Sequence, residues 1–143
     1  RNDVSINIFE SDLFKNVTSN YDLICCDVSG VSKNIAEVTG WFPTEVPKAD
    51  DTGSNLIVRV VEGSPEHLKE GGCLNICTTS FSNIKEIEST MQNSFPDKWE
   101  KILEKEVPFS KRLIANIDLL KDEMYLEKNG SYFWIFSMYK LSK

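Results

Sequence analysis

The chain has 143 residues, a length typical of one domain, and a net charge of −6 from 16 basic and 22 acidic residues. Hydrophobic residues make up 41% and charged residues 27%, an ordinary globular composition that excludes a disordered tail or a fibrous repeat. The acidic balance argues against a nucleic-acid partner, since such proteins usually carry a basic surface. No apolar run approaches the roughly 20 residues that a membrane-spanning helix needs.

The first half of the chain predicts two strands separated by polar residues. Val4–Phe9 alternates apolar and polar residues, as a strand does, and Tyr21–Asp27 is a continuous apolar run typical of a strand buried on both faces. Residues 28–53 contain several glycines and prolines, which predict a long functional loop with one short helix near Asn34–Val38.

The second half alternates helical and extended patterns. Apolar residues at helical spacing predict a helix over 54–69, which Gly71–Gly72 should end, and residues 73–78 then predict a strand. A second helix is expected over 82–93.

The last third predicts two further strands around one more helix. Residues 99–107 favour a strand, residues 110–124 an amphipathic helix, and Asn129–Gly130 a turn into an aromatic strand over 132–141. Strands alternating with helices indicate an α/β fold in a single domain, residues 1–143.

Four cysteines lie inside apolar runs without the spacing of a zinc site, so they are interpreted as buried thiols that behave as small hydrophobes: Cys25, Cys26, Cys73 and Cys77. With no signal peptide recognised, a cytoplasmic protein with reduced thiols is expected.

Three motifs occur in a meaningful order: E-S-D-L-F at 10–14, Y-D-L-I-C-C-D at 21–27 and H-L-K-E-G-G-C-L at 67–74. Together they resemble the second half of the class I S-adenosylmethionine-dependent methyltransferases, over residues 4 to 80. The nearest likeness is to the group that methylates glutamine in release factors and its small-domain relatives. The resemblance implies a Rossmann-like, mostly parallel sheet with an antiparallel final strand.

The same resemblance implies that the family's first strands are missing here. The glycine-rich loop that holds the methionine part of the cofactor precedes these motifs in the family, and only 11 residues precede Asp12. The chain is therefore expected to be the C-terminal portion of a methyltransferase-like domain. A missing N-terminal segment or a partner chain would supply the remaining strands.

The resemblance also assigns roles around the cofactor, S-adenosylmethionine. Asp12 would accept a hydrogen bond from the adenine amine, and Leu13 and Phe14 would pack against the ring. Asp27 would lie beside the cofactor and orient the nucleophile that receives the methyl group. Ligands of open α/β sheets lie outside the carboxyl ends of the strands, where these residues fall.

Substrate contacts are expected from the loop after the second strand. Asp27–Gly30 (D-V-S-G) stands where the family has N-P-P-Y, so both prolines and the tyrosine are absent. The resemblance implies a small molecule or a protein side chain as the methyl acceptor. The candidate substrate residues are Val28, Ser29, Gly30, Trp41 and Phe42.

Each assignment has a structural alternative. Asp12 can be an ordinary turn residue, Asp27 can cap the short helix after Gly30, and Trp41 with Phe42 can simply pack the loop. The functional alternatives are a methyltransferase that works within a longer chain or complex, an inactive methyltransferase-like interaction module, and an unrelated α/β domain.

Overall fold

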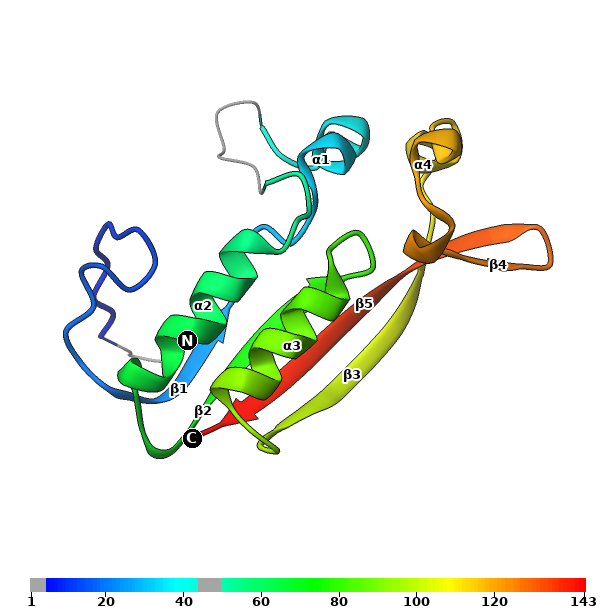
Figure 1. Cartoon of the computed structure of the whole chain (residues 1–143). Helices are drawn as coiled ribbons and strands as arrows, with labels where there is room; N and C mark the ends of the chain where they lie inside the picture. The colour runs from blue at the N-terminus through cyan, green and yellow to red at the C-terminus, as the bar shows by residue number, and fades with distance from the viewer. Residues whose placement is uncertain (1–4, 44–49) are drawn as a thin grey trace.

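The computed structural model describes residues 5–43 and 50–143, and Figure 1 shows a mixed α/β arrangement. The elements in chain order are β1 (Tyr21–Cys26), α1 (Lys33–Thr39), α2 (Asn55–His67), β2 (Leu68–Thr79), α3 (Ile84–Ser94), β3 (Trp99–Pro108), α4 (Lys111–Ile114), the 3-10 turns η1 (Ile117–Leu119) and η2 (Asp122–Met124), β4 (Leu126–Lys128) and β5 (Ser131–Ser142).

The sheet has the strand order β1-β2-β5-β3, and β4 pairs with β5. β1 and β2 are parallel, whereas β5 is antiparallel to β2, β3 and β4. The strands other than β5 therefore run in one direction, and the predicted antiparallel final strand is confirmed. The carboxyl ends of β1, β2 and β3 meet at one edge of the sheet.

Helices α2 and α3 cover one face of this sheet and pack beside each other (Figure 1). α2 buries Ile57, Val60 and Val61 at helical spacing, and α3 buries Ile87 and Met91. These side chains join alternate residues of the central strands in the main core cluster: Leu68, Leu74, Ile76, Tyr139 and Leu141. The core thus lies between the helix pair and one face of the sheet.

The opposite face of the sheet has no helix over it among the described residues. On this face Leu23 lies beside Cys73, and Met138 lies beside both Cys77 and Leu103. Leu23 is 52% and Leu103 45% exposed. β1 also forms an edge of the sheet. The prediction that β1 is buried on both faces is therefore wrong for the described chain.

The predicted strand at the start of the chain is not formed over its described part. Residues 5–9 have no regular structure, with Ile6 74% and Ile8 92% exposed, and Val4 lies outside the described residues. A strand needs a neighbour to satisfy its backbone groups, and none of the described strands pairs with this segment.

Two other boundaries differ from the sequence prediction. β2 begins directly after α2, so Gly71 and Gly72 lie inside the strand, where Gly71 takes φ +77° at an irregularity in the β1/β2 register. The helix predicted over 110–124 is broken into α4, η1 and η2. Asn116 ends α4 because its side-chain amide donates to the Arg112 carbonyl at 2.9 Å, an alternative to continued helical bonding.

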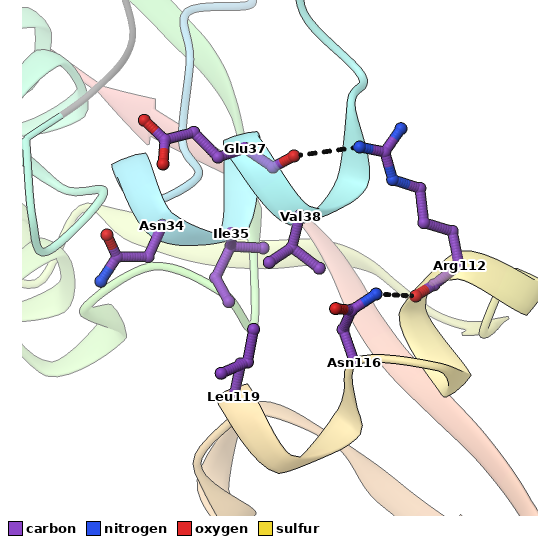
Figure 2. Close-up of a pocket in the computed structure, with 7 residues that line it drawn as sticks. All are labelled: Asn34, Ile35, Glu37, Val38, Arg112, Asn116 and Leu119. Atoms are coloured by element: carbon purple, nitrogen blue, oxygen red, sulfur yellow. Dashed lines mark hydrogen bonds between the residues drawn. The ribbon is translucent and has the colours of Figure 1, made fainter.

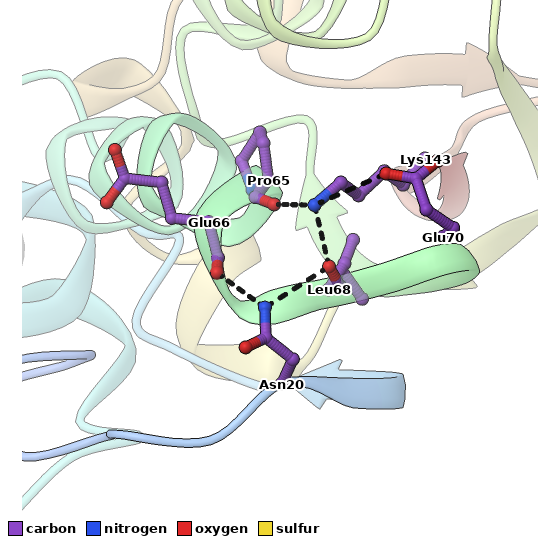
Figure 3. A network of polar contacts seen from close by, with 6 residues as sticks. All are labelled: Asn20, Pro65, Glu66, Leu68, Glu70 and Lys143. Atoms are coloured by element: carbon purple, nitrogen blue, oxygen red, sulfur yellow. Dashed lines mark hydrogen bonds and ion pairs between the residues drawn. The ribbon is translucent and has the colours of Figure 1, made fainter.

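A set of side-chain contacts joins the C-terminal end of α2 to the sheet (Figure 3). Lys143 Nζ donates to the carbonyl oxygens of Pro65 at 2.7 Å and Leu68 at 2.8 Å. The Asn20 amide donates to the Glu66 carbonyl at 2.7 Å. Carbonyls at a helix end lack intrahelical donors, so these bonds fix the junction between α2 and β2.

Candidate functional site

The loop after β1 lies at the edge of the sheet where the carboxyl ends of the parallel strands meet. Asp27 is exposed, Val28 and Ser29 are half-buried, and Gly30 is buried. Asp27 continues the alternation of Leu23 and Cys25, which places it on the open face of the sheet. Burial raises the pKa of the Cys77 thiol, and the neighbouring Asp27 charge raises that pKa further. The charge of Asp27 thus acts on Cys77 of β2.

This loop is attached to the end of β2 through the Gly30 carbonyl oxygen. Thr79 Oγ1 donates to that oxygen at 3.1 Å, and Ser82 Oγ donates to the same atom. A Cβ atom added to Gly30 would lie 2.8 Å from Ile57 Cδ1, so α2 closes the other side. Sequence reasoning missed Thr79 and Ser82, because residues 78–82 contain four hydroxyl side chains and no pattern marks these two as donors.

Aromatic side chains form a second core cluster at the same edge. The ring centroid of Trp41 lies 5.9 Å from that of Phe81 and 5.5 Å from that of Trp134. Trp41 is still 41% exposed, and Phe42 is partly buried against the cluster. Phe81 immediately precedes Ser82, so Trp41, Phe42 and the loop after β1 are held by the same short segment. Trp41 combines packing with an exposed surface that a ligand can contact.

The predicted adenine-binding residues lie in a separate turn anchored on α2. Phe14 stacks on His67 with ring centroids 4.6 Å apart, and Leu13 packs against the main core cluster. Leu13 has φ +52°, a left-handed conformation uncommon for a residue other than glycine. The Arg59 guanidinium forms an ion pair with the Asp12 carboxylate at 3.2 Å, although Asp12 remains 65% exposed.

A hollow of about 460 Å³ adjoins this turn, within the size range of small-molecule sites. Its lining is polar and consists of Glu10, Ser11, Asp12, Lys15 and Asn16. Asn16 shapes the turn because its amide donates to the Glu10 carbonyl and its backbone N–H donates to Ser11 Oγ, each at 2.9 Å. The Asp12 carboxylate is thus an accessible hydrogen-bond acceptor on a turn whose backbone is held by the hydrogen bonds of Asn16.

A further groove of about 470 Å³ lies between α1 and α4 (Figure 2). Ile35, Val38 and Leu119 are its apolar lining, while the polar lining comprises Asn34, Glu37, Arg112 and Asn116. Arg112 Nη2 donates to the Glu37 carbonyl at 3.2 Å, which ties α4 to α1. The groove was not predicted, because it depends on residues about 75 positions apart in the sequence.

The structure thus groups the candidate residues into two sets. Asp27–Gly30, Trp41 and Phe42 are gathered by the end of β2, whereas Asp12–Phe14 are held by α2. Leu13, Phe14 and Val28 nevertheless pack against the same core cluster.

The described residues contain no group of three or more His, Cys, Asp or Glu side chains placed to hold a metal ion. Nor does any helix in this part of the chain have the length and apolar character needed to cross a membrane.

One curated relative is similar to this chain over most of its length. It is a protein of Methanocaldococcus jannaschii named "Putative protein N5-glutamine methyltransferase", 28% identical over 115 residues. The match covers 80% of this chain and 58% of the relative, so the chain spans little more than half of that protein. No family profile and no solved structure matches. This distant relationship supports a methyltransferase family, and methyl transfer in general, without identifying an acceptor.

Proposed function

We propose that the chain is the C-terminal half of a Rossmann-like, S-adenosylmethionine-dependent methyltransferase domain. The observation that carries this proposal is the similarity to the archaeal relative over 115 residues. It is supported by the strand order β1-β2-β5-β3 with an antiparallel β5, and by the position of Asp27–Gly30, Trp41 and Phe42 where the parallel strands end. Asp12–Phe14 do not lie at that edge as expected, because Phe14 stacks on His67, just before the first residue of β2.

The turn around Asp12 fits the adenine end of the cofactor. Its exposed carboxylate lines a hollow of small-molecule size and can accept a hydrogen bond from an exocyclic amine, while Leu13 and Phe14 anchor the turn on the core. Arg59 holds the carboxylate in place. None of the described residues forms a glycine-rich cradle for the methionine end, so that part of the site is assigned to polypeptide outside this chain.

Asp27 is proposed to orient the methyl acceptor. When bound, S-adenosylmethionine supplies an electrophilic methyl group, and displacement at that carbon depends mainly on alignment of the nucleophile. The Asp27 carboxylate accepts a hydrogen bond from the acceptor group, and the backbone of Val28, Ser29 and Gly30 borders it. Trp41 and Phe42 provide an apolar wall at the same edge of the sheet.

A protein side chain is the acceptor favoured by the relative's name, with glutamine as the first candidate. The groove between α1 and α4 would hold residues flanking the acceptor, because its asparagine amides can pair with peptide groups. A small-molecule acceptor would leave this groove unused. Replacement of N-P-P-Y by D-V-S-G means that this chain's acceptor contact differs from that of the resembling group.

The open face and the β1 edge are proposed to bind the remaining strands and helices of the domain. Sheets with parallel strands are usually covered on both faces, yet Leu23 and Leu103 are about half exposed here. The unmatched part of the relative is roughly 80 residues long, enough for two strand–helix units of about 30 residues or more. Residues 12–14 contact α2, and residues 15–20 lead from there into β1 (Figure 1), so an N-terminal segment can reach this part of the sheet.

The second candidate is an inactive methyltransferase-like module that binds a partner through the same open face. The specific observation that favours it is the D-V-S-G sequence, which lacks the prolines and tyrosine of the resembling group. The two candidates differ in cofactor binding, since the module has no need to retain the Asp12 contact.

Isothermal titration of S-adenosylhomocysteine tests the proposal. Residues 1–143 alone should bind weakly, and the product of the whole reading frame should bind at least tenfold more tightly. Asp12→Ala should weaken binding about tenfold, as expected for loss of a charged hydrogen bond, whereas the matched Asp118→Ala should not. Absence of binding to every form of the protein would refute the cofactor assignment and favour the interaction module.

Arg59→Ala separates a direct contact of Asp12 from a structural one. If Asp12 binds adenine itself, Arg59→Ala should weaken binding less than Asp12→Ala, because the acceptor oxygen remains. Equal losses would mean that the ion pair, and not a contact with adenine, is what matters.

A further inference from the structure

The Gly30 carbonyl oxygen accepts hydrogen bonds from two hydroxyl groups at the end of β2. Thr79 Oγ1 lies 3.1 Å from it, and Ser82 Oγ donates to the same oxygen. A carbonyl oxygen has two lone pairs, so this one is fully engaged within the protein. Both donors lie about 50 residues away in the sequence.

The direction of the Thr79 bond is fixed by a second contact. The Phe81 backbone N–H donates to Thr79 Oγ1 at 3.3 Å, which leaves the single hydroxyl hydrogen of Thr79 free to point at Gly30. Ser82 is 8% exposed, so its bond is shielded from competing water. The two hydroxyl groups therefore attach the Gly30 carbonyl to the end of β2 in one fixed geometry, which exposed hydroxyl groups would not do.

Packing closes the remaining side of Gly30. A Cβ atom there would lie 2.8 Å from Ile57 Cδ1 and 3.4 Å from Ser82 Oγ. The same region is joined to residues 50–53, since the Asn83 N–H donates to the Thr52 carbonyl at 3.0 Å. Gly30 is thus fixed by α2 on one side and by the end of β2 on the other.

We propose that Thr79 and Ser82 are positioning residues for the acceptor site, acting through the Gly30 carbonyl. This rests on the proposed function, because it assigns the orientation of Asp27 and the intervening peptide groups to that attachment. Asp27 lies between Cys26, which pairs with Ile76 in the sheet, and Val28, which packs against the core, so the Gly30 attachment fixes the far end of the same short segment. A misplacement of about 1 Å can cost on the order of a hundredfold in rate when catalysis depends on alignment.

The chain offers a matched control in the neighbouring residue of β2. Thr78 Oγ1 is buried and has no hydrogen-bond partner among the described residues, and Thr78 faces the core. Thr78→Val therefore removes a hydroxyl from the same strand without touching the attachment. Thr79→Val and Ser82→Ala remove one donor each, and Thr79→Ser keeps the donor and serves as the conservative rescue.

The first measurement is ¹⁵N relaxation of residues 27–30 in the 143-residue chain, which needs no ligand. We expect order parameters near 0.85 in the unmodified protein and in Thr78→Val, and below about 0.7 in the Thr79→Val/Ser82→Ala double variant. Thr79→Ser should match the unmodified protein. Unchanged order parameters in the double variant would overturn the proposal, whatever its effect on stability.

The second measurement separates positioning from a general structural effect. The whole-reading-frame protein is given radiolabelled S-adenosylmethionine and a glutamine-containing peptide. Each single variant should lower kcat about tenfold with the KM for S-adenosylmethionine unchanged, and Thr79→Ser should restore kcat. A rise in that KM with unchanged kcat would overturn the positioning role. If the unmodified protein neither binds S-adenosylhomocysteine nor transfers methyl groups, the proposed function fails. The relaxation measurement still shows whether Thr79 and Ser82 hold residues 27–30 in place.

Discussion

Replacing Lys143 with methionine tests how far the contacts at the end of α2 stabilise the fold. The ammonium group donates to the Pro65 and Leu68 carbonyls at 2.7 and 2.8 Å (Figure 3), and the side chain is only 30% exposed. Glu70 lies 4.0 Å away and is 92% exposed, so that ion pair contributes little. Methionine keeps most of the aliphatic stem and removes only the donors and the charge.

The expected loss follows from these contacts. A hydrogen bond from a charged donor contributes about 1.5–3 kcal/mol, and a cation at a helix C-terminus adds up to about 1 kcal/mol. In the variant the side-chain amide of Asn20 still donates to the Leu68 carbonyl at 3.4 Å, and water can bind the Pro65 carbonyl in place of the ammonium group. Both effects reduce the loss. We therefore expect a loss near 2 kcal/mol in the free energy of unfolding, and a decrease of about 6 °C in Tm.

Urea unfolding followed by tryptophan fluorescence, with calorimetry alongside, measures this loss. Lys140→Met is the matched control, since Lys140 lies on β5, three residues before Lys143, and faces the open side of the sheet. It should change stability by less than about 0.5 kcal/mol. The reasoning is wrong if Lys143→Met also stays within 0.5 kcal/mol, or if the two variants lose the same amount.

Three further predictions concern the core, a tyrosine and the loop after β1. Leu74→Ala should lower the free energy of unfolding in urea by about 3 kcal/mol because the side chain is fully buried, whereas Leu23→Ala on the open face should lower it by less than 1 kcal/mol. Equal decreases would contradict a core on one face of the sheet. Burial and the hydrogen bond to Glu88 raise the pKa of Tyr139, so the folded state favours the neutral phenol. Stability should therefore be complete below about pH 10 and fall as the pH rises further, less steeply in Tyr139→Phe; parallel pH profiles would refute this. Gly30→Ala should lower Tm and disturb the amide resonances of residues 27–30, because its Cβ would meet Ile57; unchanged spectra would show that the contact relaxes freely.

Local patterns in the sequence predicted most of the regular elements. The alternation in β5 and the apolar spacing in α2 and α3 are local signals, and each of these elements was predicted within a few residues. The helix near Asn34–Val38 was likewise predicted and is α1. The Asn129–Gly130 turn also follows local rules, since both residues take positive φ between β4 and β5.

The errors arise where structure depends on distant neighbours. Residues 5–9 have a strand-like pattern, but no described strand lies beside them to pair with. Leu113 and Leu120 are buried as an amphipathic pattern over 110–124 requires, but Ile114 is 48% exposed and Asn116 breaks the predicted helix. Asp12 and Asp27 were selected by their place in motifs and Trp41 by its place in the predicted loop, whereas the contacts of Asp12 with Arg59 and of Trp41 with Trp134 required the folded chain.

The loop after β1 shows how one structural requirement can be met by different residues. Prolines in an N-P-P-Y sequence restrict φ locally, so such a loop is stiffened by its own residues. D-V-S-G has no comparable local restriction, and Gly30 adds conformational freedom. Here the restraint comes from outside the loop, through Thr79, Ser82 and the close approach of α2. The absence of the prolines therefore does not by itself make the loop flexible, and D-V-S-G remains compatible with a site that works by alignment.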